Sequence, residues 1–281
     1  MRVGVGLPST VPGSPGSAIV DWARRAEALG LASLGVLDRI VYNSLEPFVT
    51  LAAAAAVTER ISLVTMVVIG PIRSTALLAK QAGSVDAISG GRLSLGVSIG
   101  ARADDYEATE WPTTGRGRRL SEQLATFRAQ WEEEAIGPSP VRPGGPTLLV
   151  GGSSGEAFAR MARHGDGYVH GGGPPRAFAA AVAKALAAWT DLERPGRPEL
   201  WGQGYFALGG DDATEAGAAY LRDYYAFTGP FADRIAAGNL TSAGALREFV
   251  RGYEEAGCDH LVLLPTVAGV EQVDRLAEVL A

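Results

Sequence analysis

Short apolar segments alternate with segments of helical periodicity along almost the whole chain, and this alternation restricts the fold more than any other feature. Residues 61–69 show it best: the run I-S-L-V-T-M-V-V-I is ended by Gly70-Pro71 and followed by a helical pattern over residues 74–88. Eight such strand–helix units in succession favour a closed (β/α)8 barrel over an open sheet. The expected strands are residues 2–7, 32–37, 61–69, 92–98, 147–150, 167–170, 200–208 and 260–264.

The chain length agrees with a single barrel. One domain over residues 1–281 is expected, since barrels of this kind commonly use about this length. Residues 209–257 are too long for one connection, so we expect an insertion before the last strand, with helices near its ends and an irregular piece over 227–240. Two arrangements are open for its aromatic side chains, a lid over the barrel mouth or packing against the barrel wall. These side chains are Tyr220, Tyr224, Tyr225, Phe227 and Phe231.

Charge and metal-ligand content narrow the classes of function. The formal net charge of −6 gives no general electrostatic reason to expect a nucleic-acid partner. Cys258 is the only cysteine and the three histidines are far apart, so we expect no disulfide within the chain and no metal site. The sequence enters a strand-like segment directly after Met1 and has no apolar run long enough to span a bilayer. A cytoplasmic protein without membrane contact is therefore expected.

Three groups of short motifs occur in order along the chain. V-D-A-I-S-G-G-R and L-G-V-S-I-G lie between Val85 and Gly100, and R-G-R-R-L-S-E-Q ends at Gln123. P-T-L-L-V-G-G-S-S begins at Pro146, and A-E-A-L-G-L and V-L-D-R lie near the N-terminus. Together they cover most of residues 1–175 and resemble the bacterial-luciferase-like superfamily of flavin- and deazaflavin-dependent oxidoreductases. The set of motifs is specific for the superfamily, not for one reaction.

The resemblance implies a barrel that holds FMN or coenzyme F420 at the carboxyl ends of its strands. It also implies that the protein forms a homodimer. Gly151, Gly152, Ser153 and Ser154 offer backbone N–H groups and hydroxyls at the start of a helix, where the helix dipole favours a phosphate. An ordinary strand–helix turn capped by serine is the alternative for the same four residues.

Further cofactor contacts are expected on other strand ends. Gly100 permits close approach of a flat ring, and Gly172, in a run of three glycines, is a candidate for the other wall of the pocket. In the superfamily the end of the third strand lies behind the ring and often carries a cis non-proline peptide bond, which we expect near Val67 and Val68. A plain strand followed by Gly-Pro is the alternative.

Two residues are candidates for catalysis. Many members of the superfamily have a histidine directly after the acidic residue at the exit of the second strand, where this chain has Arg39 after Asp38. Arginine stays protonated at neutral pH, so it cannot shuttle protons but can stabilise an anion. His170, at the end of the sixth strand, is the best substitute for the missing histidine. A hydrogen-bonded structural role is the alternative for His170.

The other arginines near the motifs are less specific. Arg102, on the loop after the fourth strand, is expected either to be solvated or to meet an anionic group. A salt-bridged surface or a dimer contact is favoured for Arg116, Arg118 and Arg119, which lie at helical spacing from Glu122.

These features predict a flavin-dependent oxidoreductase, most specifically a luciferase-like monooxygenase that uses reduced FMN and O2 on a small organic substrate. No G-x-G-x-x-G motif opens a strand–helix turn, so the reduced cofactor is expected from a separate reductase. One alternative is an F420-dependent dehydrogenase or reductase that transfers hydride. Another is a barrel that has lost catalysis and serves as a binding or assembly subunit.

Overall fold

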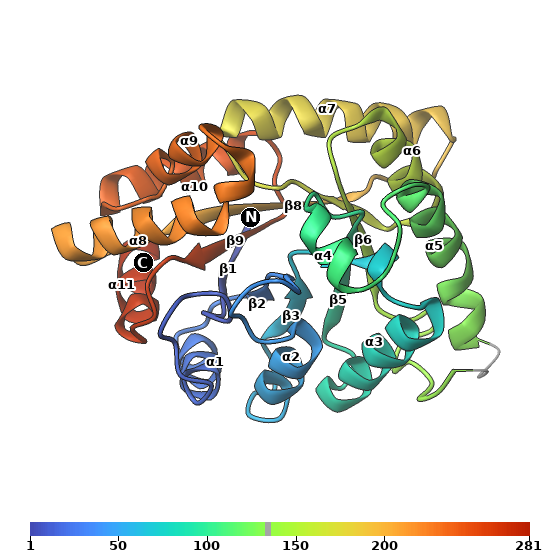
Figure 1. Cartoon of the computed structure of the whole chain (residues 1–281), viewed down its shortest axis with the longest axis horizontal. Coiled ribbons are helices and arrows are strands. Elements are labelled where there is room, and N and C mark those ends of the chain that lie inside the picture. The colour runs from blue at the N-terminus through green and yellow to red at the C-terminus, as the bar shows by residue number, and fades with distance from the viewer. Residues whose placement is uncertain (133–135) are drawn as a thin grey trace.

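The barrel strands are β1 (Arg2–Gly6), β2 (Ser33–Val36), β3 (Ser62–Thr65), β5 (Leu93–Ser98), β6 (Thr147–Gly151), β7 (Gly167–Val169), β8 (Glu199–Phe206) and β9 (His260–Pro265). The computed structural model describes residues 1–132 and 136–281 (Figure 1). Every pairing between the described strands is parallel, and the ring closes because β1 pairs with both β2 and β9 while β3 pairs with β5. The predicted (β/α)8 barrel is confirmed.

The third strand position differs from its prediction, because it is interrupted. β3 ends at Thr65, and the short strand β4 (Val68–Ile69) resumes the pairing with β5. A cis peptide bond joins Met66 to Val67, one bond earlier than Val67–Val68. Beside the interruption, the Thr65 hydroxyl donates to the carbonyl oxygen of Gly96 at 2.7 Å and accepts from its N–H at 2.8 Å. A Cβ at Gly96 would collide with the Thr65 carbonyl oxygen, so glycine is required there.

Helices surround the barrel (Figure 1). Their apolar side chains are buried against it. Trp22, Leu78 and Phe127 are among the buried side chains between helices and strands, whereas Leu149 and Trp201 belong to a second cluster that fills the barrel. The connecting helices are α1 (Ala18–Ala28), α2 (Pro47–Ala55), α3 (Thr75–Ser89), α5 (Arg116–Glu132), α6 (Gly155–His164), α7 (Pro175–Asp191) and α11 (Glu271–Leu280), with the 3-10 turn η1 (Gly70–Ile72) before α3.

The insertion lies between β8 and β9, as predicted. It contains α8 (Asp211–Tyr224), the 3-10 turn η2 (Ala226–Thr228), α9 (Phe231–Ala237) and α10 (Ala243–Glu255). The prediction of an irregular piece over 227–240 is wrong for α9. Gly229-Pro230 resembles a helix break, but Pro230 occupies the N-cap position, where no N–H donor is needed.

A second short helix, α4 (Ala103–Ala108), follows β5 where a loop was predicted. Its six residues are mostly polar and show no helical apolar pattern. Tertiary hydrogen bonds hold it: the Tyr106 hydroxyl donates to the Ile99 carbonyl oxygen at 2.5 Å, and a carboxylate oxygen of Asp105 accepts from the N–H of Ile40 at 2.9 Å. Within residues 1–132 and 136–281, each helix is too short or too polar to cross a membrane.

Candidate functional site

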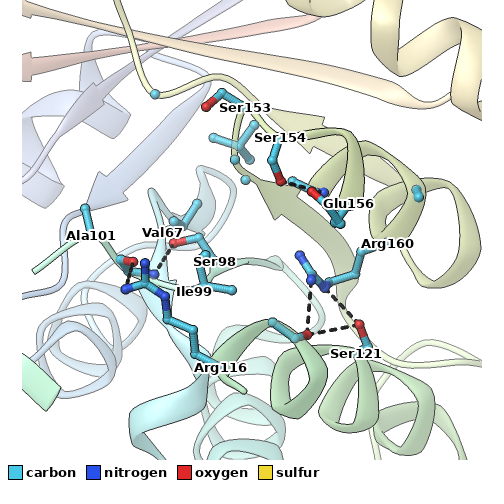
Figure 2. Close-up of a pocket in the computed structure, with 18 of the residues that line it drawn as sticks. Val67, Ser98, Ile99, Ala101, Arg116, Ser121, Ser153, Ser154, Glu156 and Arg160 are labelled. Carbon is cyan, nitrogen blue, oxygen red and sulfur yellow. Dashed lines mark hydrogen bonds between the residues drawn. The ribbon is translucent and has the colours of Figure 1, made fainter. Parts of the chain in front are cut away.

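A cavity of about 910 Å³ lies at the carboxyl ends of the barrel strands and extends between the first turns of α5 and α6 (Figure 2). Its barrel side is formed by strand ends, and its outer side by the two helices. The strand-end residues that line it include Met66, Val67, Ser98, Ile99, Gly100, Gly151, Val169, Gly171 and Gln203. The helix-side residues include Ser153, Ser154, Glu156, Arg160, Arg163, Arg116, Arg118 and Ser121.

The loop between β6 and α6 forms one end of the cavity, and all four residues predicted there line it. The Ser154 hydroxyl caps α6 by accepting from the N–H of Ala157 at 3.3 Å. Gly152 has φ +137°, and a Cβ there would lie 2.7 Å from the Cβ of Ala157. The Gly152 carbonyl oxygen accepts from the Tyr168 hydroxyl at 2.9 Å, which fixes the loop. Capped helix and loop together direct the positive end of the α6 dipole at the cavity.

Arginines make this end of the cavity cationic. Arg160 is 8% exposed and bridges the two helices by donating to the Ser121 hydroxyl and to the Gly117 carbonyl oxygen, each at 3.0 Å (Figure 2). Burial lowers the pKa of Arg160, but a guanidinium remains protonated at neutral pH. Arg116 donates to the Gly100 carbonyl oxygen at 3.3 Å. The region therefore suits an anion.

Most of the arginines at the cationic end of the cavity were not predicted from the sequence to have a functional role. Only Arg118 forms the predicted ion pair with Glu122, at 3.6 Å, and Arg118 also lines the cavity together with Arg116. Arg160 and Arg163 carried no functional prediction. Their spacing of three residues on one helix, directly after a glycine–serine loop, was the signal that could have found them.

The barrel side of the cavity is mostly apolar. Of the residues predicted to contact a cofactor here, Val67 and Gly100 line the cavity, whereas Val68 is fully buried and is not among the lining residues. Gly100 has φ +69°, and a Cβ there would lie 2.7 Å from a methyl carbon of Ile69. Gly171 lines the cavity in place of the predicted Gly172.

Arg39 is not brought into the cavity. Its guanidinium is nearly buried and donates to the Asp104 carboxylate at 2.9 Å and to the Val41 carbonyl oxygen at 2.6 Å. A carboxylate oxygen of Asp105 lies 3.5 Å from its Nε atom. Its guanidinium also lies 5.2 Å from the ring centroid of Tyr42 and 5.7 Å from that of Tyr224. These contacts tie the exit of β2 to α4 and leave Arg39 in a structural position.

The structure also places His170 outside the cavity, in contrast to its predicted catalytic position. Side chains alternate between the two faces of a strand, so Val169 lines the cavity and His170 points outward to α7. The His170 ring packs edge-on against Phe178 with centroids 5.7 Å apart, and burial lowers its pKa.

Aromatic residues of the insertion cover another part of the barrel mouth. The hydroxyls of Tyr205 and Tyr225 lie 2.6 Å apart, and the Tyr220 hydroxyl lies 2.6 Å from that of Thr10 on the β1–α1 loop. Arg102 stands between the rings of Tyr224 and Phe227, at 4.6 and 4.3 Å from their centroids. We call residues 220–227 the aromatic lid. Tyr220, Tyr224 and Tyr225 pack against side chains of the barrel, whereas Phe227 and Phe231 are 46% and 53% exposed.

The fold and the cavity define a class of protein: a (β/α)8 barrel with an anion-accepting cavity at the carboxyl ends of its strands. A family model described as luciferase-like monooxygenase matches residues 1–257, and the chain belongs to this family.

Several known proteins are similar to this chain. An uncharacterised protein of Mycobacterium tuberculosis is 32% identical over 198 residues, which covers 58% of this chain and 68% of that protein. The structure of the monooxygenase RslO1 from Streptomyces bottropensis superposes with a TM-score of 0.83 at 20% identity, over 99% of this chain and 97% of that one. An F420-dependent secondary alcohol dehydrogenase superposes with a TM-score of 0.82 at 17% identity, over 99% and 98% of the two chains. At these identities the two structures establish a shared fold.

Proposed function

We propose that this chain is an oxidoreductase with a flavin-type cofactor, most specifically a monooxygenase that uses reduced FMN and O2 on a small organic substrate. One observation carries the proposal: a single cavity joins a cationic helix terminus, with Ser153, Ser154 and Arg160, to apolar strand ends at Val67 and Gly100. Such a cavity suits a molecule with a phosphate at one end and a flat ring at the other. Membership of the luciferase-like monooxygenase family supports the reaction class.

The chain's own residues would bind and orient the cofactor. The N–H groups at the start of α6 and the hydroxyl of Ser153 would hold the phosphate, and Arg160 and Arg116 would balance its charge. Reduced FMN, when bound, supplies the electrons for the reaction with O2.

The aromatic lid would exclude water from the barrel mouth. Burial raises the pKa of Tyr205 and of Tyr225, so both hydroxyls stay protonated and uncharged at neutral pH. A neutral pair of hydroxyls that satisfy each other can stay in an apolar cover without the cost of burying a charge.

Hydride transfer with coenzyme F420 is the second candidate, and the charge of the cavity favours it. A single phosphate carries about two negative charges. The helix side of the cavity presents Arg116, Arg160 and Arg163, and also Arg118, which is paired with Glu122, against Glu156, the one carboxylate among the described lining residues. That excess of positive charge suits a cofactor such as F420, which has carboxylates beyond its phosphate.

The partners follow from the same proposal. A separate reductase would deliver the reduced cofactor, and turnover with NADH should then need the addition of a flavin or F420 reductase. A homodimer is proposed from exposed apolar side chains on and beside α2 and α3, above all Val49 and Leu77, which are 69% and 53% exposed. Val49→Glu combined with Leu77→Glu should convert a dimer into a monomer in analytical ultracentrifugation, while an unchanged sedimentation coefficient would contradict this surface.

The proposed function is tested by titrating the purified protein with FMN, reduced FMN and F420. Binding of FMN in either state, followed by O2-dependent oxidation of a substrate, would support the monooxygenase. Binding of F420 alone would support the dehydrogenase. A folded protein that binds none of the three would support the non-catalytic barrel.

A further inference from the structure

Gln203 carries a buried acceptor that the protein itself does not use. It lies on the interior face of β8, in the same alternation as Trp201 and Tyr205. The residue is 4% exposed and lines the cavity. Its Nε2 donates to the carbonyl oxygen of Gly171 at 3.1 Å, while its Oε1 has no hydrogen-bond partner among the described residues.

The orientation of this amide follows from its one hydrogen bond. If the amide were flipped, Oε1 would face the Gly171 carbonyl oxygen, and two acceptors would oppose each other. The backbone directly after β7 therefore holds the nitrogen, and the carbonyl group of the Gln203 side chain is left at the cavity. Gly172 supports this arrangement, because its φ of +94° keeps the chain close beside Gln203, with the Cγ only 3.6 Å from where a Cβ would lie.

A buried acceptor without a donor is costly, at about 1–3 kcal/mol, and calls for a partner. The remaining described walls of the cavity near the barrel are apolar side chains or small residues, such as Val67, Val169 and Gly100. The cationic groups lie on α5 and α6. A ligand with its phosphate at α6 would therefore place its ring at the Gln203 end of the cavity.

We propose that Oε1 of Gln203 accepts a hydrogen bond from the ring N–H of the cofactor's pyrimidine edge, so that Gln203 determines specificity for an imide-bearing ring. This inference rests on the proposed function and specifies the ring end of the same cavity. In flavins and deazaflavins that edge consists of a carbonyl group, an N–H group and a second carbonyl group, so its only hydrogen-bond donor is N3–H. A ring edge with acceptors alone would leave Oε1 buried and unpaired.

The test is a binding cycle that removes the two partners separately. The ligands are FMN and 5-deaza-FMN, each with and without a methyl group on N3. The proteins are the wild type and Gln203→Leu, which has similar bulk but no polar atoms. Dissociation constants are measured by fluorescence titration, without turnover. Gln203→Ala is the second variant if Gln203→Leu does not fold, and Ser153→Ala is the matched control at the phosphate end.

The proposal expects N3-methylation to weaken binding to the wild type about tenfold, and to leave binding to Gln203→Leu unchanged. Ser153→Ala should weaken the methylated and unmethylated ligands by the same factor. Two results would overturn the role of Gln203 and leave the proposed function standing. One is equal affinity of the wild type for the methylated and the unmethylated form of a ligand. The other is an equal loss of affinity on methylation in the wild type and in Gln203→Leu. A wild type that binds neither unmethylated ligand would overturn both.

Discussion

Replacement of Arg102 by methionine should loosen the aromatic lid without unfolding the barrel. Arg102 is 9% exposed, and its guanidinium lies 4.6 Å from the ring centroid of Tyr224 and 4.3 Å from that of Phe227. It also donates to the Tyr224 carbonyl oxygen at 2.8 Å. Methionine keeps the apolar stem but loses the charge and the donor.

The size of the effect follows from these contacts. The two nearest cation–π contacts contribute about 0.5–1 kcal/mol each, and the hydrogen bond from a charged group contributes about 1.5 kcal/mol. Allowing for the apolar contact that methionine retains, the lid loses about 2 kcal/mol of local stability. Opening of the lid then becomes roughly thirtyfold more frequent.

Native-state hydrogen exchange measures this directly. Backbone amides at the C-terminal end of α8 and in η2 should exchange roughly thirtyfold faster in Arg102→Met, while amides of β6 stay unchanged. The control is Arg119→Met, because Arg119 lies 5.6 Å from the ring centroid of Trp111 and does not touch the lid. Unchanged exchange in Arg102→Met, or an equal rise in Arg119→Met, would refute the reasoning.

Three further predictions concern the site and its surroundings. Combined replacement of Ser153 and Ser154 by alanine should weaken cofactor binding about tenfold or more in a fluorescence titration. The change removes the Ser153 hydroxyl from the anion site and the Ser154 hydroxyl that caps α6. Unchanged affinity would exclude a phosphate site at these residues. Arg39→Ala should lower the free energy of unfolding in urea by about 3 kcal/mol, because it leaves the buried carboxylate of Asp105 without its cationic partner. Lost turnover at unchanged stability would instead restore the catalytic role predicted for Arg39. Burial lowers the pKa of His170 in the folded state, so the unfolded state binds more protons and stability falls as pH drops below about 6.5. Between pH 7.5 and pH 5.5, the melting temperature of His170→Leu should therefore fall less than that of the wild type. An equal fall in both proteins would contradict a lowered pKa of His170 in the folded state.

Much of the fold could be predicted because a closed parallel barrel imposes a simple pattern. Its strands are buried on both faces, so they read as short apolar runs between amphipathic helices. The two helices that were missed depend on other information. α4 is held by tertiary hydrogen bonds through Asp105 and Tyr106, which no local pattern reveals. α9 begins after Pro230, which lies at the N-cap, where a proline does not interrupt the helix.

In the candidate site, too, some positions follow from the local sequence and others depend on tertiary structure. Residues 151–154 and Gly100 could be predicted to face the cavity because local chemistry, namely glycine, serine and a helix start, determines their position. His170 could not be placed, since a shift of one residue in a strand moves a side chain to the opposite face. The contacts of Arg160 with Ser121 and Gly117 arise from the approach of α6 to α5, so the sequence of α6 offers only the spacing of Arg160 and Arg163 as a signal.

The most direct test of the proposed cofactor site is a comparison of FMN and riboflavin binding to the wild-type protein by fluorescence titration. The two ligands share the ring and differ by the phosphate that we assign to the start of α6. A charge-assisted phosphate contact predicts that FMN binds at least tenfold more tightly, with an advantage that shrinks as salt is added. Equal affinity for the two ligands, or no binding of either by a folded protein that also fails to bind F420, would contradict a phosphorylated flavin-type cofactor in this cavity.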